Sequence, residues 1–258
     1  MCLLIALSRI VDGAPLVIGA NRDEFYGRPA TAMTVLQDRG PRLLGGRDHL
    51  AGGTWLAVSE HGVVAGLTNQ PSTSGPRRDP AKRSRGELPL MFAAYPDAVS
   101  AVEEVCAKLD PDAYNPCWLL VGDRRALFSV GLAGGTAPEV RELPPGQYVL
   151  ENVPLEPPSE KAARIGAELA ERLAERLAAA RDAAETGVAG AAGASGAADA
   201  LQRVLCGNEI HLEEHQYGTR SSLIVTVPWA GRPELLLAEG PPSRAPFTDV
   251  IAGGQISW

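Results

Sequence analysis

The sequence predicts an α+β fold in which two β-sheets stack face to face and helices cover both outer faces, a four-layer αββα sandwich. Two observations predict it. The first apolar run, Cys2–Leu7, is apolar at successive rather than alternate positions, which is typical of a strand buried on both faces. Strands and helices are also expected in the order strands, helices, strands, a long helix and strands again. We expect one domain over residues 1–258.

The first third of the chain is rich in apolar runs of strand length. Glu60-His61-Gly62 lies between two of them and is a typical turn sequence, so residues 55–69 are expected to form a hairpin. The expected strands are Cys2–Leu7, Pro15–Ala20, Thr54–Ser59 and Val63–Thr68.

The middle of the chain carries helix signals. Ser84 and Glu87 have the spacing of a capping box, which predicts that a helix starts there. Pro96 and Asp97 then precede a second helix, Ala98–Leu109. Further strands are expected at Trp118–Val121, Ala126–Val130 and Gln147–Leu150.

The clearest helix signal spans Ser159–Glu185, where apolar residues recur at four-residue steps beside favourable charge pairs. We expect its apolar stripe to pack on the core. Thr186–Ala198 follows, a run of Ala and Gly that is expected to be a flexible internal loop. Two more strands, Ser222–Val227 and Glu234–Ala238, complete the predicted order.

The overall charge argues against nucleic-acid binding. The net charge is −7, whereas neutralising phosphates needs clustered Lys and Arg. One dense basic stretch, Arg77–Arg85, also contains Asp79, and we expect a solvated loop there rather than a phosphate site. No signal peptide is evident, and no apolar run approaches the roughly 18 residues of a membrane span. We therefore expect a cytoplasmic protein without a membrane span.

The cysteines and histidines show no metal-ligand spacing. No Cys-x-x-Cys motif occurs, and His211 and His215 lie four apart in a sequence expected to be a loop. We therefore expect no metal and no cofactor. Cys106, Cys117 and Cys206 are expected to be reduced, buried and inert.

Cys2 differs because it would become the first residue once Met1 is removed, a step that a small second residue permits. The freed α-amine has a pKa of about 7.7–8.0, close to the pKa of a free thiol at about 8.5. The amine can therefore act as the base for its own side chain or, when protonated, favour the thiolate. Alone, a Met-Cys start is weak evidence for such chemistry.

A polar cluster follows the second predicted strand. Asn21-Arg22-Asp23-Glu24 comes directly after an apolar run, which is also typical of a solvated turn. However, the first two strands are separated only by a turn near Asp12-Gly13, so they should pair antiparallel. That pairing would place Asn21–Asp23 near Cys2, where a carboxylate can orient an ammonium and an arginine can favour a thiolate.

Several sequence blocks, each unspecific alone, occur in a specific order over most of the chain outside the Ala/Gly-rich stretch. They are Met1-Cys2-Leu3-Leu4, Asn21-Arg22-Asp23-Glu24-Phe25 with Arg28-Pro29, Gly45-Gly46-Arg47-Asp48, Ala51-Gly52-Gly53-Thr54-Trp55, Leu67-Thr68-Asn69, Ser84-Arg85-Gly86-Glu87-Leu88 and Gly218-Thr219-Arg220-Ser221-Ser222. In this order the blocks resemble the NRDE proteins, also called the transport-and-Golgi-organisation-protein-two family.

That family is similar to the cysteine-type amidases that include penicillin V acylase and bile-salt hydrolase, which have the αββα fold of N-terminal-nucleophile hydrolases. The resemblance implies that Cys2 is the nucleophile and that Asp23 holds its α-amine. It implies Asn69 and Asn152 as oxyanion or orienting groups. It also implies that Arg220 is the charge beside the sulfur.

Other positions carry weaker expectations. Asn21 and Arg22 are expected to be binding residues of the site. Trp55 is expected to lie in the core and not to act as a surface for the substrate. Gly45-Gly46-Arg47-Asp48 could shape the pocket but is also a plain turn sequence. Residues 155–161 lack the Trp of the Pro-Trp-Pro-Lys segment usual in the family, which leaves the register around Asn152 open.

The implied function is hydrolysis of a non-peptide carbon–nitrogen (amide) bond of a small-molecule substrate, by acyl transfer through Cys2. The alternative is a non-catalytic carrier of a hydrophobic small molecule, because members of the resembling family have been connected with haem trafficking and lipid metabolism and a fold does not fix function. A carrier has no need of a free Cys amine. Removal of Met1 therefore distinguishes the two.

Overall fold

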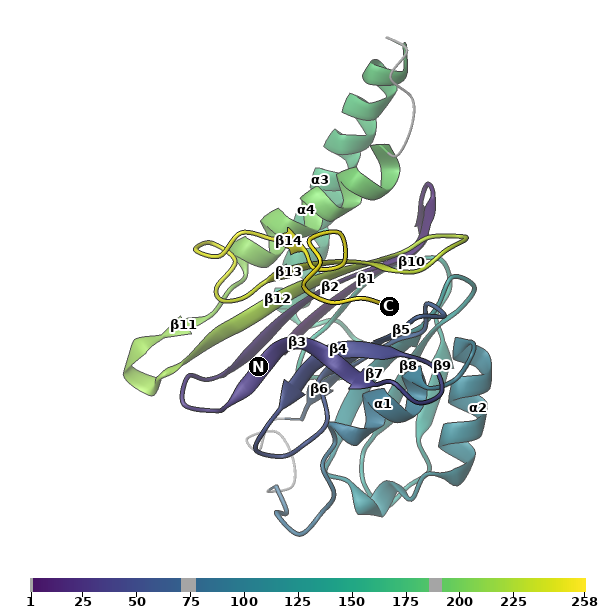
Figure 1. Ribbon diagram of the computed structural model, residues 1–258, viewed down its shortest axis with the longest axis vertical. Helices are drawn as coiled ribbons and strands as arrows, with labels where there is room; N and C mark the ends of the chain where they lie inside the picture. Colours follow the sequence, from purple (N-terminus) through teal and green to yellow (C-terminus); the bar gives the residue numbers. More distant parts are fainter. Residues whose placement is uncertain (1, 71–77, 186–191) are drawn as a thin grey trace.

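The computed structural model describes residues 2–70, 78–185 and 192–258 and has the four expected layers (Figure 1). Two antiparallel sheets stack face to face. Helices α3 (Glu160–Glu185) and α4 (Ala192–Gly207) cover the outer face of one sheet, and α1 (Glu87–Ala93) and α2 (Ala98–Lys108) cover the outer face of the other. The predicted αββα sandwich is therefore confirmed.

The first sheet contains the amino-terminal strand, β1, next to its hairpin partner, β2. Strand β2 lies between β1 and β12, so both of its edges are paired. Across the sheet the strands are β10 (Gly146–Leu150), β1 (Cys2–Val11), β2 (Ala14–Phe25), β12 (Tyr217–Val227), β13 (Glu234–Ala238) and β14 (Thr248–Asp249), with β11 (His211–Leu212) paired to β12.

The second sheet follows the order of the chain. Its strands are β3 (Ala30–Gln37), β4 (Leu43–Asp48), β5 (Leu56–Ser59), β6 (Val64–Asn69), β7 (Cys117–Gly122), β8 (Leu127–Leu132) and β9 (Glu139–Glu142). Short 3-10 turns occupy Pro111–Ala113 and Glu213–His215. No helix in the described ranges is long and apolar enough to cross a membrane.

Strand β1 packs against a neighbouring layer on each of its two faces. Leu4 and Ala6 pack in the core between the two sheets, whereas Leu3, Ile5 and Leu7 pack beneath α3 and α4. Burying one such Leu or Ile side chain stabilises the fold by about 1.5–3 kcal/mol. The unbroken apolar run of β1 thus serves two cores at once, as its sequence predicted.

The polar cluster after the second apolar run is part of β2 and is not a turn. Strand β2 continues to Phe25, and Asn21, Arg22 and Asp23 are 1%, 5% and 5% exposed. The alternative of a solvated turn is therefore wrong. The strand continues because β1 and β12 supply backbone partners on both sides as far as Arg22.

Two local expectations need correction. Helix α1 begins at Glu87 with Gly86 as its N-cap, and the hydroxyl of Ser84 donates to the carbonyl of Gly52, so the expected capping box does not form. Residues 192–198 belong to helix α4 instead of a flexible loop, while 186–191 lie outside the described residues. Alanine has the highest helix propensity, and buried contacts on the sheet, such as that of Leu201, offset the cost of the glycines.

The double glycine of β4 also lies in a strand and not in a turn. A Cβ atom at Gly46 would come within 1.8 Å of the Trp55 ring, and one at Gly45 within 2.2 Å of the Leu56 carbonyl oxygen. Only glycine allows the indole to lie directly against β4. Trp55 packs against the core between the sheets, as predicted, and its ring also faces the cavity described next.

Candidate functional site

The amino-terminal end of β1 opens into a cavity of about 700 Å³. This volume falls within the usual range for small-molecule pockets. The cavity is lined by Cys2, Arg22, Asp23, Asn69 and Asn152, which reach it from β1, β2, the end of β6 and the segment after β10. The structure thus brings together residues that are up to 150 positions apart in the chain.

Asn152 links the start of β1 to the end of β6. Its side-chain oxygen accepts a hydrogen bond from the backbone nitrogen of Cys2 at 3.0 Å, and its side-chain nitrogen donates to the Asn69 carbonyl at 2.5 Å. Asn152 is 7% exposed, so these hydrogen bonds take the place of bonds to water at an almost fully buried position. The register left open by the missing Trp is thereby established, with Asn152 facing Cys2.

Asp23 is held on the neighbouring strand. The Thr219 hydroxyl donates to its carboxylate at 2.6 Å, and the Tyr217 hydroxyl donates to its backbone carbonyl at 2.7 Å. Burial raises the pKa of Asp23 to about 6, while the Thr219 hydrogen bond opposes that rise. A carboxylate in such a position ionises readily when a cation lies beside it.

Cys2 is half-buried and lies in the cavity wall. Burial raises the pKa of its thiol and the charge of Asp23 raises it further, whereas the amino-terminal charge, the Asp23 backbone N–H and the charge of Arg22 lower it. Cys2 and Arg22 are directly paired across β1 and β2, which places their side chains on the same face of the sheet. Because the thiolate is the reactive form, the neighbouring cation favours nucleophilic chemistry.

Arg22 is a buried cation with an aromatic neighbour. Its guanidinium lies 4.4 Å from the centroid of the Trp55 ring, a cation–π distance. Within the described part of the chain, no carboxylate lies within ion-pair distance of it. The charge beside the sulfur is therefore supplied by Arg22.

The expectation that Arg220 lies beside the sulfur is wrong. The pairing of β12 with β2 shifts register between Thr219 and Ser221, and this irregularity redirects the residue between them. The guanidinium of Arg220 donates to the carbonyls of Phe25 and Tyr26 at 2.9 and 2.5 Å. It therefore fixes the end of β2 and does not line the cavity.

Asn21 is likewise structural and does not line the cavity, contrary to expectation. Its side-chain nitrogen donates to the carbonyls of Leu205 and Asn208 at the end of α4, and its oxygen accepts from the Ser222 hydroxyl. Side chains alternate along a strand, so Asn21 faces the helices while Arg22 faces the other sheet. Asn21 thus satisfies carbonyls at a helix end.

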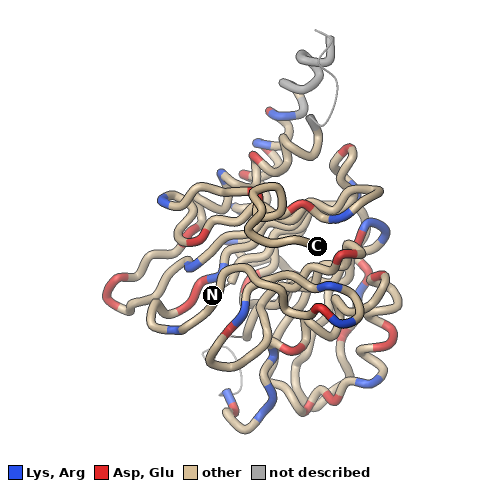
Figure 2. The backbone as a smooth tube through the Cα atoms, in the orientation of Figure 1, with Lys and Arg blue, Asp and Glu red and all other residues tan. Residues whose placement is uncertain are grey.

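The basic stretch expected to be a solvated loop contributes to the cavity wall. Arg78, Lys82, Arg83 and Arg85 all line it, while Arg77 lies outside the described residues. In Figure 2 the blue positions of this segment follow directly after the grey trace. Charge density was the only sequence signal, and it could not reveal which surface the loop covers.

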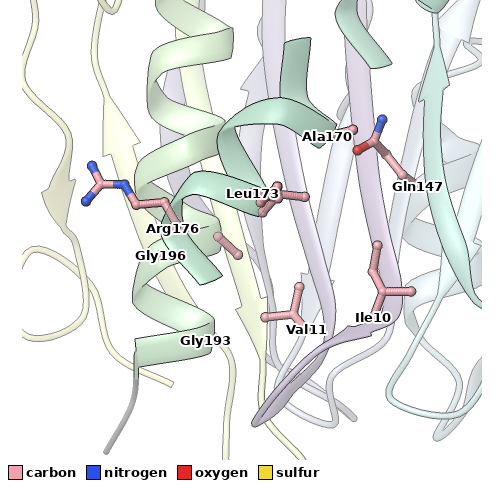
Figure 3. A pocket seen from close by; sticks show the side chains of 10 residues that line it. Ile10, Val11, Gln147, Ala170, Leu173, Arg176, Gly193 and Gly196 are labelled. Carbon is pink, nitrogen blue, oxygen red and sulfur yellow. The ribbon is translucent and has the colours of Figure 1, made fainter. Parts of the chain in front are cut away.

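A second cavity, of about 370 Å³, lies where β1 ends beneath α3 and α4 (Figure 3). Its lining is mainly apolar and includes Ile10, Val11 and Leu173. The amide of Gln147 is used by the Gly166 carbonyl, and Arg176 pairs with Asp199 at 3.4 Å. Among the described residues that line it, this cavity offers packing surface but no nucleophile.

The other cysteines and the histidines lie elsewhere. Burial raises the pKa of Cys117 to about 12 and that of Cys106 to about 11, so both remain thiols at neutral pH. His211 accepts or donates a hydrogen bond with the Tyr26 hydroxyl at 2.8 Å. Among the described residues, no group of three or more His, Cys, Asp or Glu side chains could hold a metal ion.

Comparison with known sequences points to one family. The family model for Transport and Golgi organisation 2 matches residues 1–236. The Transport and Golgi organization protein 2 homolog of Bos taurus is 36% identical over 154 residues, covering 57% of this chain and 53% of that protein. The Homo sapiens homolog is 34% identical over 155 residues, with the same shares covered. The match therefore spans about half the length of these curated relatives.

Comparison with solved structures gives the fold. Penicillin V acylase from Agrobacterium tumefaciens has a TM-score of 0.54 at 10% identity, covering 93% of this chain and 83% of its own. A variant of conjugated bile acid hydrolase from Clostridium perfringens has a TM-score of 0.55 at 13% identity, covering 96% and 92%. At these identities the similarity concerns the arrangement of layers, which is that of N-terminal-nucleophile hydrolases.

Proposed function

Because this chain belongs to the Transport and Golgi organisation 2 family and has the N-terminal-nucleophile hydrolase fold, we propose that it is an amidohydrolase whose nucleophile is Cys2. The proposed reaction cleaves a non-peptide carbon–nitrogen bond of a small molecule by acyl transfer. Removal of Met1 is part of the proposal, because only then does the Cys2 nitrogen become a free amine.

One observation carries the proposal. The backbone nitrogen of Cys2, the atom that would become the α-amine, is held by Asn152 at 3.0 Å in the same cavity that contains the thiol. A structural cysteine needs no polar group at its backbone beyond its strand partner. Asp23 lines the same cavity with a carboxylate whose pKa burial raises to about 6, and it would ionise beside a free ammonium.

The proposed chemistry has two steps. In the first, the thiolate of Cys2 attacks the amide carbon, and the negative charge that develops on the oxygen is stabilised by the side chain of Asn69. The α-ammonium, oriented by Asp23 and Asn152, then gives a proton to the leaving nitrogen as the carbon–nitrogen bond breaks. In the second, the same amine takes a proton from water, which attacks the thioester and releases the acid. Loss of one oxyanion donor typically lowers such rates about 10²–10³-fold.

The experiment combines intact mass with an activated ester. We expect purified protein to lack Met1 and to release one equivalent of p-nitrophenol in a burst from p-nitrophenyl acetate, as the acetyl group moves to the sulfur of Cys2. Cys2→Ala and Cys2→Ser should abolish this burst, whereas the matched control Cys206→Ala should keep it. The acetylated residue is identified by peptide mapping.

Retention of Met1 in protein that still gives the full burst would contradict the proposed role of the amine. A burst that survives in Cys2→Ala would show that another nucleophile is acylated. Either result would leave the fold assignment intact and remove the mechanism.

One observation favours a second candidate, a carrier of a hydrophobic small molecule. The apolar cavity under α3 and α4 could hold such a ligand at a distance from Cys2 (Figure 3). A carrier would bind lauric acid equally well in the wild type and in Cys2→Ala, and it would need no removal of Met1. Equilibrium titration of both proteins, together with the burst assay, separates the two functions.

A further inference from the structure

The cavity around Cys2 is positively charged although the chain as a whole has a net charge of −7. Six basic side chains line it in the described residues, against three acidic ones. The basic residues are Arg22, Arg28, Arg78, Lys82, Arg83 and Arg85, and the acidic residues are Asp23, Glu24 and Asp48. The charge is therefore concentrated where a substrate would enter.

Some of these charges neutralise one another. Arg28 pairs with Asp48 at 2.7 Å and with Glu24 at 3.6 Å, which accounts for two of the acids. Arg83 pairs with Glu87 at 2.5 Å on the exposed side of the segment. Within the described ranges, the structure gives no carboxylate partner to the four remaining cations, Arg22, Arg78, Lys82 and Arg85.

Two of the unpaired cations line the cavity from different parts of the fold. Arg22 projects from β2 beside Cys2. The guanidinium of Arg85, in the segment before α1, donates to the Pro116 carbonyl at 3.0 Å, and that carbonyl also accepts the backbone N–H of Gln70, the residue after Asn69. Arg85 is thereby fixed at the end of β6, next to the proposed oxyanion group.

Placing these cations in the cavity wall costs free energy, and this cost calls for an explanation. Burial lowers the pKa of the Arg85 guanidinium, and the charge of Arg78 lowers it further. Burial likewise lowers the pKa of Arg22. Like charges brought together and partly removed from water destabilise a fold unless an anion joins them. Backbone carbonyls position Lys82 and Arg85 but leave their charge uncompensated.

From this arrangement, and resting on the proposed acyl transfer, we infer that the substrate carries an anionic group, a carboxylate or a phosphate. Arg22 and Arg85, with Arg78 and Lys82 behind them, would bind this group and hold the scissile carbonyl over Cys2. Guanidinium groups suit both anions because they donate paired hydrogen bonds. The substrate class is thus an N-acyl compound bearing a carboxylate or a phosphate, and not a neutral amide.

Two alkylating agents, one anionic and one neutral, test this inference without knowledge of the substrate. Iodoacetate and iodoacetamide both form a carbon–sulfur bond and release iodide, but only iodoacetate is an anion. The ratio of their rates is measured at Cys2 by peptide mapping and compared with the ratio for 2-mercaptoethanol. We expect the ratio to be at least about tenfold higher at Cys2, and to fall towards the free-thiol value in 1 M NaCl.

Arginine variants locate the effect. Arg85→Gln and Arg78→Gln should each lower the ratio of the iodoacetate rate to the iodoacetamide rate at Cys2 at least threefold. Arg39→Gln, at an exposed position outside the cavity, is the matched control and should change neither rate. If Arg85→Gln fails to fold, the exposed Arg78→Gln still provides the test.

A ratio at Cys2 equal to that of 2-mercaptoethanol would overturn the inference, even where Cys2 reacts rapidly with both reagents. Failure of the proposed function looks different, because Cys2 would then react with neither reagent faster than Cys206. Protection of Cys2 from iodoacetamide distinguishes the two anions. At equal ionic strength, protection by inorganic phosphate but not acetate assigns a phosphate, the reverse assigns a carboxylate, and protection by neither beyond chloride contradicts an anion site.

Discussion

The two ends of strand β1 open into two cavities of opposite character. At Cys2 the lining is polar and charged, and buried groups such as Asp23 and Arg22 are held against water. At Ile10 and Val11 the lining is mainly carbon, and its two polar side chains are satisfied within the protein. The same strand thus borders two different cavities. Forming the cavity at Cys2 costs free energy because charged groups are buried there, whereas the apolar cavity costs only lost van der Waals contacts.

The difference indicates how to recognise function in this fold. Burying a charge requires compensation, so a cluster of buried charges persists only where it is used or neutralised. An apolar gap carries no such implication, since protein interiors contain voids. In this protein an apolar cavity is therefore weaker evidence of catalysis than a cavity whose charged side chains cost free energy to bury.

The largest effect is expected for Asp23→Asn. An amide cannot attract an ammonium as a carboxylate does, so the acetylation rate of Cys2 should fall at least about 100-fold. Glu24→Gln, one residue along β2, should lose far less, because the Glu24 carboxylate contacts Arg28 at 3.6 Å and accepts the backbone N–H of Phe25 at 2.9 Å. Burst kinetics with p-nitrophenyl acetate measure both. Equal losses of the acetylation rate in the two variants would show that Asn21–Glu24 is a structural motif and not a catalytic one.

In protein that retains Met1, and so has no free Cys2 ammonium beside Asp23, the same variant should not be destabilised at high pH. Burial raises the pKa of Asp23 to about 6, from about 3.9 in an unfolded chain. Its contribution to stability is therefore fully present below about pH 4 and lost as the pH rises through about 6. Relative to wild type, the melting temperature of Asp23→Asn should be about 5–10 °C higher at pH 8 than at pH 4. A variant that is less stable at pH 8 would contradict this burial cost.

A smaller effect is expected for Arg22→Gln. Removing the cation raises the pKa of the Cys2 thiol, so alkylation by iodoacetamide at pH 7.5 should slow about tenfold and its pH profile should move to higher pH. Arg22→Lys keeps the charge and should restore much of the rate. A profile that is unchanged in Arg22→Gln would show that the thiol does not depend on this residue.

The smallest effect on chemistry is expected at the apolar cavity. Leu173→Ala removes a half-buried side chain of α3 that packs against the core between this helix and the sheet, so the free energy of unfolding should fall by about 1–2 kcal/mol. Cys2 labelling should remain at the wild-type rate. Denaturant unfolding and peptide mapping check the two parts. A loss of labelling in this variant would link the two cavities and remove the contrast between them.

The sequence predicted the layers and the placement of Cys2 and Asp23 because both follow from pairing between neighbouring strands. It misplaced Arg220, since the register shift in β12 has no signature in the residue pattern. Asn21 could have been placed correctly, because strand alternation puts it opposite Arg22 once β2 is continued to Phe25.

Helix α4 and the basic wall were missed for different reasons. The glycines before Ala197 lowered the expected helix propensity, although Leu201 and Leu205 have the spacing of a buried face. Arg85 depends on its contact with Pro116, 31 residues away, and no local pattern predicts such a contact. Long-range side-chain contacts of loops were therefore the part of the site beyond sequence reasoning.

The position of β2 between β1 and β12 has a dynamic consequence. Its amides up to Arg22 belong to ladders on both sides, so their exchange with deuterium requires opening of the sheet, whereas the facing wall at residues 78–86 is largely loop. The two walls of the cavity should therefore move on different timescales, slow behind Arg22 and Asp23 and fast behind Arg78 and Lys82. A substrate would meet a rigid reaction wall and an adaptable binding wall, so different anions could be accommodated without disturbing the geometry at the sulfur.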